Sequence, residues 1–189
     1  MRRGSALSRV AVASVAALAT VCLLCAQETH WTATSPAPHA GDDAKPNSSA
    51  VPDEYALTGH FDRIVVIRVK SGADLLEGVK RAVKEQNIEN GVILSAIGSL
   101  RGYAVHQVSN REFPVQDTFE KNPMQPVDLV SMNGYVINGR IHAHMTLATP
   151  DRVIAGHMEE GNEVFTYAIV TIGEMNGTNL DRIDDKTYR

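Results

Sequence analysis

Cysteine is scarce in this sequence of 189 residues, and both cysteines lie close together near the N-terminus. Cys22 and Cys25 fall within a run from Val10 to Ala26 that contains only apolar or small residues. A chain that begins after this run has no thiol. We therefore expect neither disulfide bonds nor thiol chemistry in the rest of the protein.

Basic residues are outnumbered as well, with 18 Lys and Arg against 22 Asp and Glu, a formal net charge of −4. Without Arg2, Arg3 and Arg9, 15 basic residues would stand against the same 22 acidic ones, and the formal charge would be −7. Because affinity for nucleic acids comes largely from basic side chains that neutralise phosphates, this composition argues against nucleic acid as a partner. The sequence also lacks internal repeats and any phosphate-binding loop or cofactor motif.

The N-terminal segment, residues 1–26, is typical of a secretory signal peptide. Arg2, Arg3 and Arg9 precede the uncharged run, and cleavage after Ala26 would leave Gln27 as the first residue. The alternative is an uncleaved membrane anchor, since about 17 apolar residues is the lower limit for spanning a bilayer. We expect an exported protein, periplasmic or secreted, which is membrane-anchored only if the segment is retained.

The remaining chain divides into three parts by composition. Residues 27–54 are rich in Ser, Thr, Ala, Pro, Asp and Asn, and they predict a disordered linker because they bury too little apolar surface to offset the entropy of ordering. Residues 55–175 carry periodic apolar patterning and are long enough for one core. Residues 176–189 form a polar C-terminal tail.

One early helix followed by many strands predicts a single α+β domain with a mainly antiparallel sheet. The helix is expected to begin after Ser71, with Asp74 in a capping-box arrangement, and to end near Asn87. The stretch 109–126 is irregular, with Phe113–Phe119 as a candidate strand. The other expected strands are His60–Val69, Val92–Ile97, Tyr103–Val108, Val127–Ile137, Arg140–Ala148, Val153–Met158 and Glu163–Ile172.

Three histidines converge if the last strands pair as the turn sequence indicates. Thr149–Arg152 reads Thr-Pro-Asp-Arg, which favours a turn centred between Pro150 and Asp151. In that register His144 lies opposite His157, and His142 lies on the same face one step along the strand. A one-residue slip in the pairing would place the histidines in the core. In the predicted register, the other face instead collects apolar residues suited to a core: Ile141, Ala143, Met145, Leu147, Ile154 and Met158.

Three neutral imidazoles around one point predict a divalent metal site formed by His142, His144 and His157. Zn²⁺ suits such a set with its fourth position open to water or a small ligand, and other first-row metals remain alternatives. A pair of strand histidines bonded only to their neighbours is the structural alternative. His106 is on another strand and is expected to be either a fourth ligand or a residue with no role.

Three glutamates near the histidines are candidates for proton transfer. Glu159 is expected opposite His142, where it could act as a ligand, as a partner of a ligand or as a base. Glu160 and Glu163 flank Gly161 and are weaker candidates for the same roles.

Four segments in a fixed order resemble the PPC domain family (plants and prokaryotes conserved, also called DUF296). They are Ser71–Glu77 (SGADLLE), Gly91–Leu100 (GVILSAIGSL), Ile141–Ala148 (IHAHMTLA) and Arg152–Gly161 (RVIAGHMEEG). The resemblance covers about residues 59 to 174. It implies a central antiparallel sheet with flanking helices, assembled as a homotrimer, and a metal site at His142, His144 and His157. Prokaryotic members carry a DNA-binding label, but this chain has no Arg-Gly-Arg-Pro hook.

Three functions are compatible with these patterns. The first is an exported trimeric module that binds a divalent metal or a small ligand. The second is a metal-dependent enzyme of unknown substrate, in which one of the three glutamates moves protons. The third is DNA binding, which rests on the family label alone.

Overall fold

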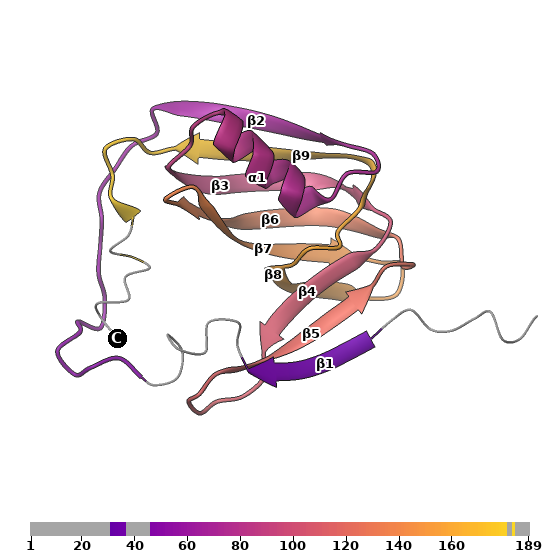
Figure 1. Ribbon diagram of the computed structural model, residues 1–189, viewed down its shortest axis with the longest axis horizontal. Coiled ribbons are helices and arrows are strands. Elements are labelled where there is room, and N and C mark those ends of the chain that lie inside the picture. The colour runs from indigo at the N-terminus through magenta and orange to yellow at the C-terminus, as the bar shows by residue number, and fades with distance from the viewer. Residues whose placement is uncertain (1–30, 37–45, 181–182, 184–189) are drawn as a thin grey trace, which may run out of the picture.

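The computed structural model describes residues 31–36, 46–180 and 183, and these residues form one antiparallel sheet with one α-helix on it (Figure 1). The strands follow the order β1-β5-β4-β8-β7-β6-β3-β9-β2. The elements are β1 Trp31–Pro36, β2 Arg63–Lys70, α1 Leu75–Glu85, β3 Asn90–Leu100, β4 Tyr103–Val108, β5 Gln116–Asn122, β6 Val127–Ile137, β7 Arg140–Ala148, β8 Val153–Met158 and β9 Val164–Glu174.

The expected α+β fold with a mainly antiparallel sheet is confirmed, although the described residues contain one α-helix where the resemblance implied several. The predicted bounds of β4, β6, β7 and β8 are also confirmed. β5 begins at Gln116 rather than Phe113. The Asn110 side chain holds the preceding loop by donating to Pro114 O at 2.8 Å and accepting from Gln116 N at 2.9 Å.

The N-cap of the helix lies three residues later than predicted. Asp74 is the N-cap itself, and its Oδ1 accepts from Glu77 N at 3.0 Å, so Ser71 does not cap the helix. Asp74 is favoured because its Oδ2 also accepts from Gly161 N at 2.8 Å and Asn162 N at 3.0 Å, two donors that sequence patterns do not place there. The helix therefore begins where it meets the loop after β8.

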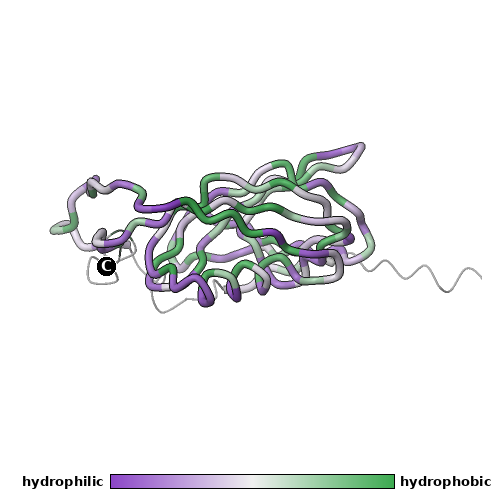
Figure 2. The backbone as a smooth tube through the Cα atoms, turned by 90° about the horizontal axis from the view of Figure 1, so that it is seen from above, coloured by the Kyte–Doolittle hydropathy of each residue, from purple (hydrophilic) through white to green (hydrophobic). Residues whose placement is uncertain are grey.

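The core lies between α1 and the sheet face that α1 covers. Hydrophilic and hydrophobic residues alternate along the helix in Figure 2, which shows it lying along one side of the sheet. Leu75, Val79 and Val83 are the buried residues of the helix. They pack with buried strand residues of the same face, among them Ile67, Val69, Ile93, Leu129, Met145, Leu147, Val170 and Ile172.

The opposite face of the sheet, here called the open face, carries alternate residues of the same strands. Ile97 pairs with Ile169, which pairs with Arg68, so this row faces away from the helix. Large apolar residues on the open face are exposed: Ile64 52%, Val66 65%, Ile97 56%, Tyr135 42%, Phe165 47% and Tyr167 42%.

Strand β1 lies within residues 27–54, the predicted disordered linker, and the prediction is wrong for residues 31–36. This strand pairs with β5 along its whole length, from Trp31 with Lys121 to Pro36 with Gln116. An edge strand is held mainly by backbone hydrogen bonds, so it forms without the apolar residues whose scarcity indicated a linker.

No helix within the described residues is long and apolar enough to cross a membrane. The predicted signal segment, residues 1–26, lies outside the described residues.

Candidate metal centre

The candidate site is built on one row of directly paired residues that crosses five strands of the open face. Asn133 of β6 pairs with His144 of β7, His144 pairs with His157 of β8, and His157 pairs with His106 of β4. The row continues to Phe119 of β5. The predicted pairing of His144 with His157 is therefore confirmed. Directly paired residues of antiparallel strands project from the same face, so these side chains are neighbours.

The rings of His142, His144 and His157 gather around a common point. Their centroids are 5.4 Å apart for His142 and His144, 4.8 Å for His142 and His157, and 5.2 Å for His144 and His157. The ring of His157 is nearly perpendicular to the other two, at 81° and 83°. One ligand nitrogen from each ring lies within 4.8 Å of the others. Nitrogens bound to one tetrahedral Zn²⁺ are about 3.4 Å apart, so modest ring rotations bring this set to ligand distances.

The surroundings of His144 favour the form that can bind a metal, although the residue itself is exposed. Desolvation lowers the pKa of His144 below its usual value, and the positive charges of protonated His142 and His106 lower it further. A neutral imidazole is the metal-binding form of histidine, so the environment prepares His144 to act as a ligand. The three residues therefore fit a divalent metal in their geometry, and the lowered pKa of His144 favours its role as a ligand.

The hairpin that presents the histidines is fixed at its turn. Thr149 N donates to Arg152 O at 2.9 Å, and Thr149 Oγ1 accepts from the backbone N–H groups of Asp151 and Arg152. Arg152 also donates to Tyr103 Oη at 2.6 Å and to Glu120 at 2.9 Å, which joins the turn to β4 and β5.

A close approach of two strands sets the position of His142. Gly134 of β6 has a φ of +150°, and a Cβ at this position would lie 2.1 Å from His142 O. Only glycine allows β6 to come this close to β7. The same stretch lines a pocket of about 300 Å³ on the open face, bounded by Val92, Ile93, Asn133, Gly134, Tyr135, His142 and His144.

The three glutamates named from the sequence occupy different places. The β7–β8 ladder ends at His144 and His157, so Glu159 does not pair with His142 as predicted. Instead Glu159 N donates to Ala104 O at 3.2 Å, and its Oε1 lies 2.5 Å from His106 Nδ1. The difference arises because the end of β8 pairs with β4, a contact between strands far apart in the sequence.

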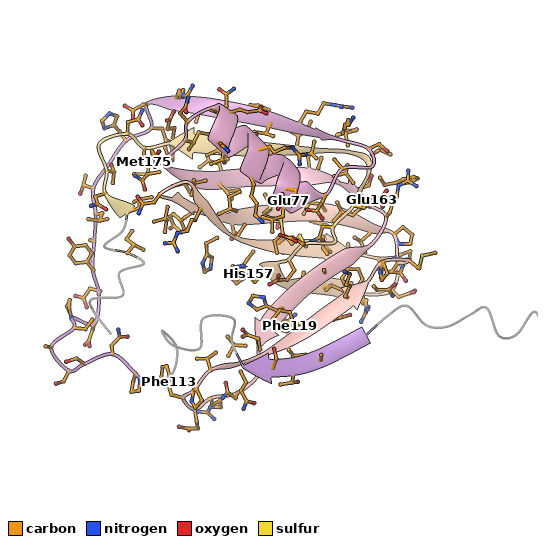
Figure 3. All side chains as sticks on the ribbon, in the orientation of Figure 1. Glu77, Phe113, Phe119, His157, Glu163 and Met175 are labelled. Carbon is orange, nitrogen blue, oxygen red and sulfur yellow. The ribbon has the colours of Figure 1, made fainter. Side chains whose placement is uncertain are left out.

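Glu160 and Glu163 contact cations away from the histidines. Glu160 accepts from Lys80 Nζ at 3.0 Å, and Glu163 lies 3.1 Å from Arg101 Nε. In Figure 3 Glu163 lies well away from His157, whereas Phe119 lies close to it.

His106 is the residue whose place the sequence did not predict. Its ring stacks on that of His157 with centroids 4.5 Å apart and an angle of 23° between the planes. Its position within β4 puts it on the open face. The pairing of β4 with β8 joins segments far apart in the chain, so no local sequence pattern predicts that His106 lies beside His157. Of the remaining histidines, His60 is exposed and 3.3 Å from Asp62. His30 and His39 lie outside the described residues.

Sequence relatives of this chain include two bifunctional GlmU proteins from Synechococcus strains. One is 22% identical over 131 residues, which are 69% of this chain and 20% of that protein. The other is 23% identical over 124 residues, which are 65% of this chain and 18% of that protein. The chain thus spans about a fifth of the length of the curated relatives it matches.

Solved structures show the same fold. A metal-containing protein from Archaeoglobus fulgidus is similar with a TM-score of 0.56 at 22% identity, over 66% of this chain and 87% of that one. A plant- and prokaryote-conserved protein from Pyrococcus horikoshii has a TM-score of 0.54 at 24% identity, over 67% of this chain and 87% of that one.

A family model matches residues 56–176, which include the helix, the histidine hairpin and every strand of the sheet except β1. This range is more than half of the chain, and it agrees with the resemblance seen in the sequence motifs. The chain belongs to the family of the Plants and Prokaryotes Conserved (PCC) domain.

Proposed function

We propose that this protein is a metal-binding module that holds a divalent ion through His142, His144 and His157. The observation that carries the proposal is the mutual approach of three imidazole nitrogens to within 4.8 Å on one face of the sheet. Zn²⁺ is the first candidate because it accepts three nitrogen ligands in tetrahedral geometry and leaves a fourth position open. The metal-containing structural neighbour from Archaeoglobus fulgidus supports the proposal.

The pocket beside His142 and His144 can hold a small molecule that binds at the open coordination position of the metal. Its lining combines the apolar side chain of Val92 with the amide of Asn133 and the ring of Tyr135. A small molecule that reaches the metal through an oxygen or nitrogen atom can place its remaining atoms against these residues. We therefore assign the module a small-ligand function in addition to metal binding.

Metal content tests the proposal directly. Protein refolded with Zn²⁺, Co²⁺ or Ni²⁺ and then freed of excess ion is expected to retain about one equivalent per chain, as measured by elemental mass spectrometry. His157→Ala should reduce this content strongly, while the control His60→Ala removes an exposed histidine and should not. Retention by the parent protein of less than about a tenth of an equivalent of every one of these metals contradicts the proposal.

Export is part of the proposed function. Cleavage after Ala26 would leave β1, which begins at Trp31, within the mature chain. The native protein can be isolated from separated fractions of its own cells. Its mass then reports the N-terminus, and the fraction that contains it reports the compartment. A chain that starts at Met1 and is found in the cytoplasm contradicts export. A chain that starts at Met1 and is found in the membrane fraction indicates an anchor.

We also propose that the protein assembles as a homotrimer through the open face. Exposed apolar residues on neighbouring strands, among them Ile97 at 56% and Val66 at 65%, form a surface of the kind that interfaces cover. Native mass spectrometry should show three chains. Ile97→Arg should shift the assembly toward monomers, whereas Met124→Arg, at an exposed apolar residue outside the strands, should not. A parent protein that is monomeric at micromolar concentration contradicts the trimer.

A metal-dependent enzyme is the second candidate, and the pocket next to His142 and His144 favours it. Hydrolysis of a panel of esters, phosphates and amides by parent protein and His157→Ala would test this candidate. Turnover that disappears in a folded His157→Ala protein supports it. Nucleic acid as a partner receives no support from the acidic composition, even though a similar structure from Bacteroides thetaiotaomicron is described as a candidate DNA-binding protein.

A further inference from the structure

We infer that His106 is a positioning residue that fixes the ring of His157 for metal binding, and that Glu159 acts on the site through His106. This inference rests on the proposed metal function and adds two residues that do not belong to the ligand set. It starts from contacts on the open face, where His106 is the direct neighbour of His157 across β4 and β8.

His106 is held on four sides. One face of its ring stacks on His157 at 4.5 Å, and Phe119 packs against it at 5.0 Å. Its Nδ1 lies 2.5 Å from Glu159 Oε1, and its Nε2 lies 3.8 Å from Asp117 Oδ2. The Asp117 side chain is buried and the His106 side chain is only 15% exposed, so the ring has little freedom to rotate.

Glu159 is itself held by the loop after β8. Its backbone N–H donates to Ala104 O, and its carbonyl accepts from Asn162 Nδ2 at 2.6 Å. Asn162 is fully buried and also bonds both backbone groups of Ala104. The carboxylate of Glu159 therefore reaches His106 from a backbone that is fixed to β4, and it keeps the His106 ring in one orientation.

The stack restricts His157 in turn. His157 meets His142 and His144 edge-on, so rotation of its ring moves the ligand nitrogen away from theirs. A flat ring 4.5 Å away limits that rotation before any metal arrives. Fixing a ligand in advance lowers the entropic cost of binding, and removal of such supporting groups weakens metal affinity about 10- to 100-fold.

Co²⁺ binding measures this effect, because the visible spectrum of Co²⁺ reports both affinity and ligand geometry. His106→Ala is expected to weaken Co²⁺ binding about 10-fold and to change the spectrum. Glu159→Ala should weaken binding in the same direction. Glu159→Gln keeps an oxygen acceptor for His106 Nδ1 and should stay within about 3-fold of the parent. The control His60→Ala should bind as the parent does.

The double variant His106→Ala with Glu159→Ala separates the inference from direct ligation by Glu159. If Glu159 acts through His106, the double variant binds Co²⁺ as weakly as His106→Ala alone, because the two losses are not additive. Additive losses, or a Glu159→Gln protein as weak as Glu159→Ala, would mean that the carboxylate acts on the metal itself, and they overturn the inference.

Two further measurements keep the outcomes distinct. Thermal melting of each metal-free variant shows whether it is folded. If His106→Ala does not fold, His106→Phe replaces it, because phenylalanine keeps a flat ring but cannot bond to Glu159. His106→Phe is then expected to lose more than about 3-fold in affinity. A parent protein that binds Co²⁺ and a His106 variant that binds it equally well overturn this inference alone. A parent that binds none removes the proposed function and the inference together.

Discussion

At the scale of single residues, the lowered pKa of His144 links protonation to folding. Its folded pKa is lowered, chiefly by desolvation, while the unfolded value stays near 6.5. The unfolded state therefore binds the proton more readily than the folded state does. The stability of the metal-free protein is retained above pH 6.5 and falls as the pH drops from there toward the lower folded pKa.

Urea unfolding of the metal-free protein at several pH values measures this dependence. His144→Gln removes the titrating ring, so the stability of that variant should vary less as the pH falls below about 6.5. Equal slopes for parent and variant would show that His144 is not the group responsible. Protons also compete with the metal for all three rings, so bound Zn²⁺ should be released as the pH falls below about 6.5. Metal that stays bound at about pH 4 argues against histidine ligands.

At the scale of the helix, Asp74 connects α1 to the loop after β8. Asp74→Ala removes one bond to Glu77 N and two bonds to Gly161 and Asn162, and it should lower the free energy of unfolding by about 2 kcal/mol or more. Ser71→Ala is the matched control, because Ser71 does not cap the helix, and it should cost less than about 0.5 kcal/mol. Chemical denaturation measures both values. A larger loss for Ser71 would restore the cap predicted from the sequence.

At the scale of paired strands, Gly134 controls the approach of β6 to β7. Gly134→Ala places a methyl group where His142 O already lies, so the two strands must separate beside His142, one of the proposed metal ligands. We expect a loss of about 2 kcal/mol or more in unfolding free energy and weaker Zn²⁺ binding. Ser131→Ala, at an exposed position of the same strand, is the control. A Gly134→Ala protein with unchanged stability would contradict the close approach.

The elements differ in how far the sequence predicts them. The β7–β8 hairpin was predicted with its register, because its turn residues and its alternating apolar face are both local signals. The pairings of β4 with β8 and of β1 with β5 join segments far apart in the chain, and the alternation of a strand does not identify its partner. This is why His142, His144 and His157 were predicted as a set, whereas the contacts of His106 and Glu159 were found only in the structure.

At the scale of the whole molecule, metal binding should stabilise the folded state by mass action. Free Zn²⁺ at about 100 times its dissociation constant adds about 2.7 kcal/mol, which corresponds to a rise in Tm on the order of 10 °C for a domain of this size. Scanning calorimetry with and without Zn²⁺ measures this shift. His157→Ala should show little of it and His60→Ala all of it. An equal shift in His157→Ala would indicate that the ion binds elsewhere.

The short ladder between β4 and β8 has a consequence for the order of assembly. It consists of two residue pairs, Val105 with Met158 and His106 with His157, and it joins β4, β5 and β1 to the remaining strands. His142, His144 and His157, the proposed ligands, lie within one hairpin and come together after closure of a short loop. His106 reaches them only when a distant part of the chain docks, and closure of a longer loop costs more entropy. We therefore expect a nascent chain to bring the three hairpin histidines together early and to add the stacked ring of His106 late.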